Sequence, residues 1–343
     1  MQPFLQKAIP RFLRFLRRHR GGLLISLTVC LLSLSLYVAL YFAAHPHAML
    51  RFLATIELRT LDARFQLRGP RLPGPAVVIV AIDQKSQDVL GRWPFPRRHF
   101  AEAVDFLREA GAKAIAFDVN FPQPDQNSAL QAIREVRKQY EASTPAAARA
   151  PRYAARLKRL EEDADNDRKF AQSLANCENA ILGYFFLPES EARNQNPELV
   201  EEFLNYLSFQ AYPRLVNPEH ADKFEGPHFY SLSPNLPAFA LPAKNFGFFN
   251  VLPDPDGVVR RASAVIRFRG SFYPSLDVAS ALAYTNRPLD EVGVFFNPNG
   301  LERIDFGPVA IPTDPQGFVQ IDFRGPAGTF PTYSLADVVQ RKL

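Results

Sequence analysis

Residues 76–125 read AVVIVAIDQKSQDVLGRWPFPRRHFAEAVDFLREAGAKAIAFDVNFPQPD and contain the clearest structural pattern in the chain. The apolar, β-branched run at 77–82 predicts a strand that is buried on both faces. Apolar residues at helical spacing over 100–111 predict a helix that ends at a glycine, and residues 114–117 predict a second buried strand. This order predicts two neighbouring parallel strands that are joined by a right-handed crossover.

Each of these two predicted strands is followed directly by a carboxylate, Asp83 in the first case and Asp118 in the second. Ligands of open parallel sheets bind outside the carboxyl ends of the strands, so both side chains are candidate ligand-binding groups. Paired carboxylates at this position would also suit metal-assisted phosphoryl chemistry. The simpler interpretation is that each Asp caps the turn that follows it. No glycine-rich phosphate loop follows the first strand.

The N-terminal region has the pattern of a membrane anchor. The chain has a net charge of +5, and residues 1–20 contain six basic residues and no acid, so the basic character belongs to this tail and not to the remainder. A nucleic-acid partner is therefore not expected. The next 24 residues, 21–44, carry no charge. A helix of this length is long enough to span a bilayer. A cleavable signal peptide is the alternative, but its apolar region is normally shorter.

The positive-inside rule then predicts a cytoplasmic tail at 1–20, one transmembrane helix at 21–44 and an extracytoplasmic remainder. The lipid bilayer would then be the first partner of the chain. Residues 45–75 predict a membrane-proximal helix and a linker rich in Pro and Gly.

Residues 76–343 form the predicted main domain. Dense mixed charge at 126–165 predicts a helical hairpin insertion, interpreted either as a solvated projection or as the contact of a homodimer. Residues 180–186 predict another buried strand, and short strands and a helix at 276–284 follow a long loop-rich stretch. The predicted fold class is therefore α/β: an N-terminal transmembrane helix followed by a mixed, mostly parallel sheet with flanking helices and a helical hairpin insertion.

Other candidate site residues have simpler interpretations beside the functional ones. Trp93 is a candidate ligand-binding residue, although a Trp beside Pro at such a junction is more often a core plug. Arg260 and Arg261 are candidate anion-binding residues, or else the solvated start of a strand. Asp254 and Asp256 resemble half of a calcium loop, but no distal acid completes it and a plain turn is the alternative.

Apart from Asp83 and Asp118, no arrangement of residues in the sequence suggests catalysis. His99 has no His or Cys partner at metal-ligand spacing, and no nucleophile motif is present. We therefore expect no enzyme activity and no cofactor in this chain.

Several separated blocks of sequence carry a resemblance to a known family. They are LDARFQLRGP at 61–70, the 77–125 stretch, NDRKFAQSLANCENAILGYFF at 166–186 and FGFFNVLPDPDGVVRRASAVIRFRGSFYPSLDVASALAY at 246–284. Together they resemble the second type of CHASE domain, a name that stands for cyclases and histidine kinases associated sensory extracellular. The resemblance implies the sensory half of a bacterial transmembrane receptor. The output half of such receptors is an adenylate or guanylate cyclase, a diguanylate cyclase or a kinase.

The resemblance also implies that family members continue, after a helix like the one predicted at 334–343, into a further strand, several spanning helices and the output domain. We therefore expect a C-terminally incomplete sensor domain in which one strand edge or one face of the sheet is uncovered. Its stimulus would be an unidentified small molecule or another environmental signal. Two rival functions are a membrane-tethered, metal-dependent hydrolase that uses Asp83 and Asp118, and a dimerisation module without a ligand.

Overall fold

The computed structural model describes residues 28–38, 46–143 and 150–342. The chain divides into two units, residues 1–70 and 71–343. In the first unit, residues 28–38 are helical and α3 spans Pro46–Arg68. Most of the predicted span at 21–44 lies outside the described residues, and among those described no helix is long and apolar enough to cross a membrane.

The central element of the second unit is β3 (Ala180–Leu187), the strand that the sequence predicts as buried. It pairs in parallel with β2 (Ile115–Phe117) on one edge and with β6 (Asn245–Phe248) on the other. The far half of β3 pairs with the antiparallel β5 (Ser231–Ser233). The prediction of a mixed α/β fold with parallel strands is therefore confirmed.

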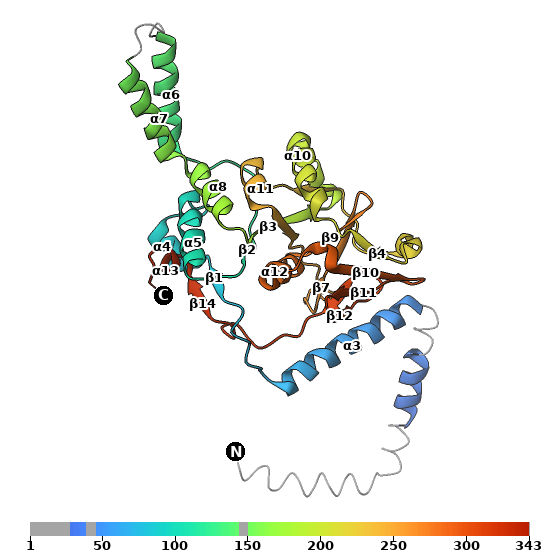
Figure 1. The fold of residues 1–343 in the computed structure, drawn as a ribbon. Coiled ribbons are helices and arrows are strands. Elements are labelled where there is room, and N and C mark those ends of the chain that lie inside the picture. Colours follow the sequence, from blue (N-terminus) through green and yellow to red (C-terminus); the bar gives the residue numbers. More distant parts are fainter. Residues whose placement is uncertain (1–27, 39–45, 144–149, 343) are drawn as a thin grey trace, which may run out of the picture. The chain divides into compact units, whose positions relative to one another are not determined.

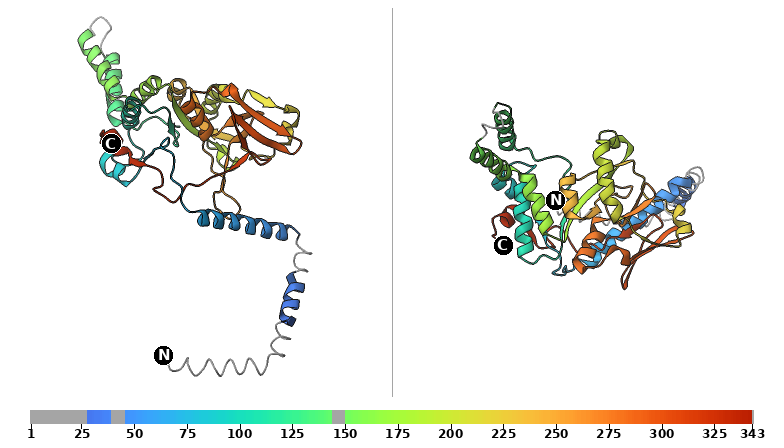
Figure 2. Two further views of the ribbon diagram at one scale, coloured as in Figure 1. Left: turned by 60° about the horizontal axis from the view of Figure 1, so that its bottom comes forward. Right: turned by 45° about the horizontal axis from the view of Figure 1, so that its top comes forward.

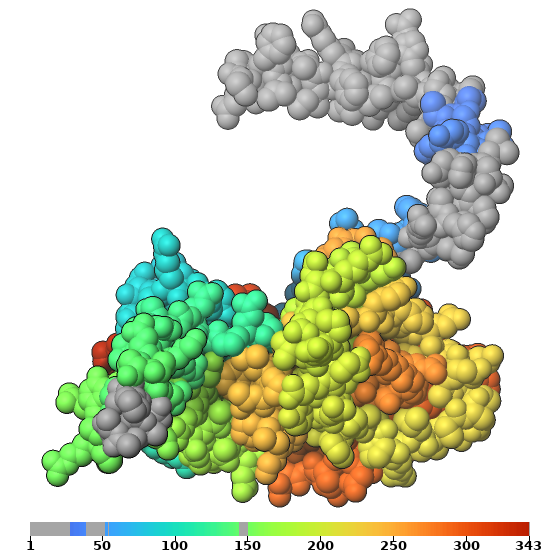
Figure 3. Space-filling model, turned by 90° about the horizontal axis from the view of Figure 1, so that it is seen from above, coloured from blue at the N-terminus to red at the C-terminus, as the bar shows by residue number. Residues whose placement is uncertain are grey.

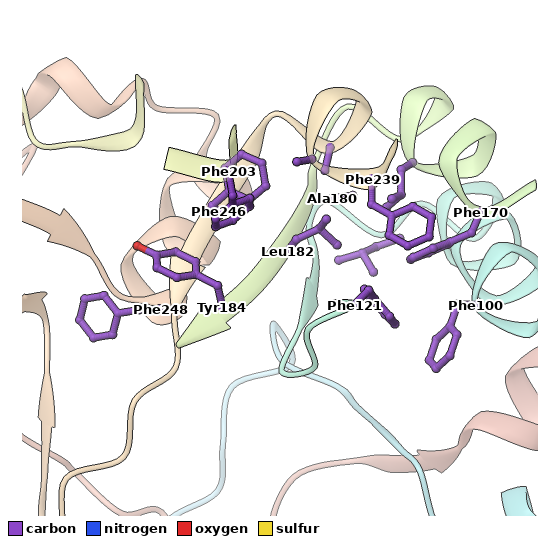
Figure 4. Close-up of a cluster of buried hydrophobic side chains, with 14 of the residues drawn as sticks. Phe100, Phe121, Phe170, Ala180, Leu182, Tyr184, Phe203, Phe239, Phe246 and Phe248 are labelled. Carbon is purple, nitrogen blue, oxygen red and sulfur yellow. The ribbon is translucent and has the colours of Figure 1, made fainter. Parts of the chain in front are cut away.

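Helices α5 (Arg97–Glu109), α8 (Asn166–Asn176), α11 (Pro237–Ala243) and α10 (Pro197–Leu207) pack over this sheet. Figure 3 looks down on the face where α8, α11 and α10 lie side by side. Beneath them, the rings of Phe100, Phe121, Phe170 and Phe239 form one contiguous cluster, with neighbouring centroids 5.0–5.9 Å apart. Figure 4 shows this cluster beside a second group around Tyr184. The abundant phenylalanines therefore supply core volume.

The predicted neighbouring pair of strands is wrong. β1 (Ile79–Ala81) does not pair with β2; it pairs in parallel with β14 (Thr332–Ser334) in a separate two-stranded sheet. The run is also not buried on both faces, since Val77 and Val78 remain 53% and 51% exposed. Its partner is a short Thr-Tyr-Ser segment, which has no apolar strand pattern and could not be recognised by hydrophobicity.

A second cluster of buried residues lies between α12 (Leu276–Thr285) and the sheet of order β12-β11-β10-β4. That sheet's strands are β4 (Arg214–Val216), β10 (Val292–Asn297), β11 (Gly300–Phe306) and β12 (Val309–Pro312). Two further pairs are β7 (Arg261–Ser263) with β13 (Phe318–Gln320), and β8 (Val265–Phe268) with β9 (Ser271–Pro274). The remaining short helices include α4 (Gln84–Leu90), α9 (Glu189–Ala192) and α13 (Leu335–Val339).

The predicted helical hairpin is confirmed as α6 (Ser128–Ser143) and α7 (Pro151–Ala164). The rings of Tyr140 and Tyr153 pack edge to face at 4.9 Å, and Arg134 pairs with Glu161 at 3.0 Å. Figures 1 and 2 show these two helices projecting from the rest of the second unit. We refer to α6 and α7 together as the arm.

Candidate functional site

Asp83 joins the starts of two helices that are distant in the sequence. It is the N-cap of α4, where Oδ1 accepts from the Ser86 backbone N–H at 2.8 Å and from Ser86 Oγ at 2.7 Å. The same oxygen accepts from Ser334 Oγ at 2.7 Å, and Ser334 is the N-cap of α13. We call Asp83, Ser86 and Ser334 the cap cluster; Figure 1 shows its two helices next to each other.

Electrostatics reinforce the cap cluster. Lys85 Nζ lies 2.6 Å from Asp337 Oδ1, which links α4 to α13 a second time. The hydrogen bonds from Ser86 and Ser334 hold the pKa of Asp83 below its ordinary value, because they favour the charged carboxylate. These contacts favour the capping interpretation of Asp83, and its ligand-binding role stays a prediction.

Asp118 lies at the carboxyl end of β2, but its acidic neighbour is Asp277 in the first turn of α12 and not Asp83. Removal from water raises the pKa of Asp118, and the negative charge of Asp277 raises it further. Removal from water likewise raises the pKa of Asp277. Within the described part of the chain neither carboxylate has a salt bridge. Each carboxyl group therefore holds a proton more readily than an ordinary Asp does, although both residues are exposed to solvent.

An ion-pair network joins the turn before β7 to the first residue of that strand; its members are Asp254, Asp256, Arg260 and Arg261. Arg260 Nη1 lies 3.2 Å from Asp254 Oδ2, and these two side chains are only 4% and 2% exposed. Arg260 also binds Asp256 at 2.8 Å, which lowers the pKa of Asp256 to about 2. Arg261 bridges Asp254 at 2.8 Å and Asp314 at 2.7 Å. The charges satisfy one another, which favours a structural role over anion or calcium binding.

The side chain of Asn250, which lies near this turn, also has its hydrogen-bond partners within the protein. Its Oδ1 accepts from the Phe186 backbone N–H and its Nδ2 donates to the Phe186 carbonyl, each at 2.8 Å. The side chain thus continues the pairing of β6 with β3 by two further hydrogen bonds. The incomplete calcium-loop pattern is therefore a turn whose polar groups hold the sheet edge.

Trp93 is not the buried plug that the sequence suggests, because it is 44% exposed. Phe95 is fully buried in its place, and Trp93 contacts the edges of Phe95 and Phe100 with centroids 5.5 and 6.2 Å away. A partly exposed indole remains compatible with a ligand contact. His99 is buried and its Nδ1 lies 3.0 Å from Glu102 Oε2.

The model of the CHASE2 domain family matches residues 29–343. The chain belongs to the CHASE2 domain family. This is a family of sensory extracellular domains that are found in signalling receptors, so the resemblance in the separated sequence blocks is confirmed. Searches of curated proteins and of solved structures found no match.

One polar cluster of this CHASE2 domain was not predicted from the sequence. Arg97, at the start of α5, is 7% exposed and lies over the Phe121 ring at 4.7 Å. Burial lowers its pKa, while the charges of Asp167 and Asp125 act in the opposite direction. Asp125 and Asp167 bracket the arm, and Asp167 Oδ2 accepts from the Asp125 backbone N–H at 3.0 Å. The sequence did contain one indication of this cluster, because the two acids stand at the two ends of the predicted insertion.

Proposed function

We propose that this chain is the extracytoplasmic sensory module of a bacterial transmembrane signalling receptor. The observation that carries the proposal is the CHASE2 match over residues 29–343. The N-terminal pattern supports the finer placement: a basic, acid-free tail at 1–20 precedes an uncharged stretch at 21–44. The proposed location is the inner membrane, with the tail in the cytoplasm and residues 45–343 outside.

The proposed mechanism is a population shift. A stimulus that binds one arrangement of the domain more tightly than another changes their ratio, and the helix that leads to the membrane communicates this change. The output activity would belong to a cyclase or kinase domain of the same receptor. Asp118 with Asp277, and the partly exposed Trp93, are candidate contacts for the stimulus.

The geometry gives the rival hydrolase little support. Asp83 and Asp118 follow strands of two different sheets, and Asp83 already accepts three hydrogen bonds at one oxygen. Among the described residues no group of three or more His, Cys, Asp or Glu side chains is arranged to hold a metal ion. A sensor requires only a ligand-selective arrangement, which the fold can provide.

A binding screen tests the sensing proposal against a purely structural module. The full chain in detergent micelles is heated with panels of amino acids, dicarboxylates, sugars, nucleotides and divalent cations. A compound that binds the native state raises the melting temperature in proportion to the logarithm of its concentration above Kd. We expect at least one class to do so in saturable fashion. Melting that is unchanged by every class would instead favour a dimerisation module without a ligand.

A further inference from the structure

An open pocket whose lining includes four Asn and Gln residues lies at the start of β3 and β6 and at the end of α12. Its volume is about 320 Å³, at the lower end of the range for small-molecule pockets. The amides come from four separate segments, Asn179, Gln210, Asn245 and Asn286, and Arg287 completes the polar lining. We call this pocket the amide cavity. No candidate residue from the sequence lies in it.

Two of the amides are fixed in orientation by the backbone. Gln210 Nε2 donates to the Lys244 carbonyl at 3.0 Å, and Asn245 Nδ2 donates to the Glu178 carbonyl at 3.3 Å. An amide carries two donor hydrogens and an acceptor oxygen with two lone pairs, so each side chain keeps an acceptor and a second donor for another group. Donors and acceptors that are already oriented reduce the entropy cost of binding.

The charge of the amide cavity is close to balanced. Arg287 Nη1 lies 2.9 Å from Glu291 Oε2, so the one cationic lining residue is already paired. Ala279, Leu282 and Ala283 of α12 provide an apolar wall. The lining therefore offers neutral hydrogen-bonding groups beside apolar surface, which suits an uncharged ligand with both hydroxyl and C–H faces.

We propose that the amide cavity binds a small uncharged polyhydroxylated molecule of the monosaccharide class. A hydroxyl group both donates and accepts, as does each amide, whereas a charged ligand would have to compete with the Arg287–Glu291 pair. This inference deepens the proposed sensing function and rests on it. It adds a candidate binding site at the amino ends of β3 and β6 to the candidate contacts Asp118 and Trp93.

The test measures sugar binding directly, because high sugar concentrations stabilise folded proteins without a site. D-Glucose and D-ribose are titrated onto the full chain in micelles by saturation-transfer NMR, with glucose 6-phosphate as the charged counterpart. We expect saturable binding of an uncharged sugar in the millimolar range or tighter. We also expect Gln210→Ala and Asn179→Ala each to weaken it about fivefold, the loss of one hydrogen bond.

Gln172→Ala is the matched control, since Gln172 is exposed on α8 and bonds only Asn176 among the described residues. Its affinity should equal that of the unmodified chain. Gln210 and Asn179 are both half-buried and are replaced in separate variants. If one variant misfolds, the other still tests the inference. Absence of sugar binding, binding by both variants that is as tight as binding by the unmodified chain, or tighter binding of glucose 6-phosphate would each overturn the inference. Sensing itself would survive that failure if another class in the broader screen binds.

Discussion

Ser334 Oγ donates a hydrogen bond of 2.7 Å to Asp83 Oδ1, although 251 positions separate the two residues. Asp83 follows β1 by two residues and Ser334 ends β14, so this contact lies next to the parallel pairing of Ala81 with Ser334. The Asp83 carboxylate, which the sequence suggested as part of a binding site, therefore caps α4 and accepts a hydrogen bond from the N-cap residue of α13.

The cap cluster predicts a specific loss of stability. Asp83→Ala removes the N-cap of α4 and the partner of Ser334, so the free energy of unfolding should fall by about 1–2 kcal/mol. Ser334→Ala should cost a similar amount, and the double variant should cost less than the sum, because both remove the same contact. Chemical denaturation of the four proteins measures this coupling. Strictly additive effects would show that the two residues act independently.

The same cluster gives a pH dependence. The pKa of Asp83 is lower in the folded protein than in the unfolded chain, so its stabilisation is fully present above the ordinary Asp value of about 3.9. It is lost as the pH falls through the lowered folded-state pKa. The stability difference between the unmodified chain and Asp83→Asn should therefore shrink on acidification. Asp88→Ala, on the exposed side of α4, serves as the control that should show little difference at any pH.

Asp118 should behave in the opposite way. Its folded-state pKa is raised, so the carboxylate destabilises the fold at neutral pH, and this penalty disappears as the pH falls below the ordinary Asp value. Asp118→Asn should raise the melting temperature slightly at pH 7, since the side chain is partly solvated, and should have no effect near pH 3. A lower melting temperature at pH 7 would show that Asp118 has a stabilising partner.

The buried ion-pair network predicts a large effect. Asp254→Asn leaves the buried Arg260 with one carboxylate fewer, and removal of one member of a buried pair costs roughly 3–5 kcal/mol. Glu201→Gln is the matched control, because its bidentate pair with Arg269 is exposed and is expected to contribute little to stability. Denaturant midpoints compare the two. Equal losses would mean that burial of the network does not determine its contribution.

The exposed apolar residues at β1 predict self-association. Val78 is 51% exposed beside a strand whose one partner in the described part is β14, and such edges pair with other chains. Val78→Lys should therefore reduce the apparent size of the chain in light scattering at high concentration. Leu72→Lys changes an even more exposed apolar residue outside any strand and should have little effect. If both variants act alike, general hydrophobicity and not the strand edge drives association.

Local pattern was sufficient to predict the elements whose sequence is periodic. The spacing of apolar residues identified α5 and α12, and the apolar run at 180–186 identified β3. β14 could not be predicted, because three residues of Thr-Tyr-Ser composition become a strand only through pairing with β1. The parallel partner of each strand is a non-local property, so the pairing of β1 with β2 was inferred from chain order and was wrong.

The candidate sites likewise combine features that are visible in the local sequence with features that depend on the fold. The acid-rich turn near 254 was visible in the sequence, whereas the enclosure of Arg260 by Asp254 depends on burial. The acidic partner of Asp118 is Asp277, which belongs to a helix 159 positions later and shares no motif with it. The amide cavity gathers single Asn and Gln residues from four segments, and such residues carry no signal individually.

The side of the membrane on which residues 71–343 lie tests the account most directly. Ser190→Cys places a thiol on the exposed α9, in a chain that also carries Cys30→Ser and Cys177→Ala. Intact spheroplasts expressing this variant are treated with a membrane-impermeant thiol reagent. The account predicts that Cys labelling at position 190 is complete before lysis. Protection of that thiol until the membrane is broken would contradict an extracytoplasmic sensory module.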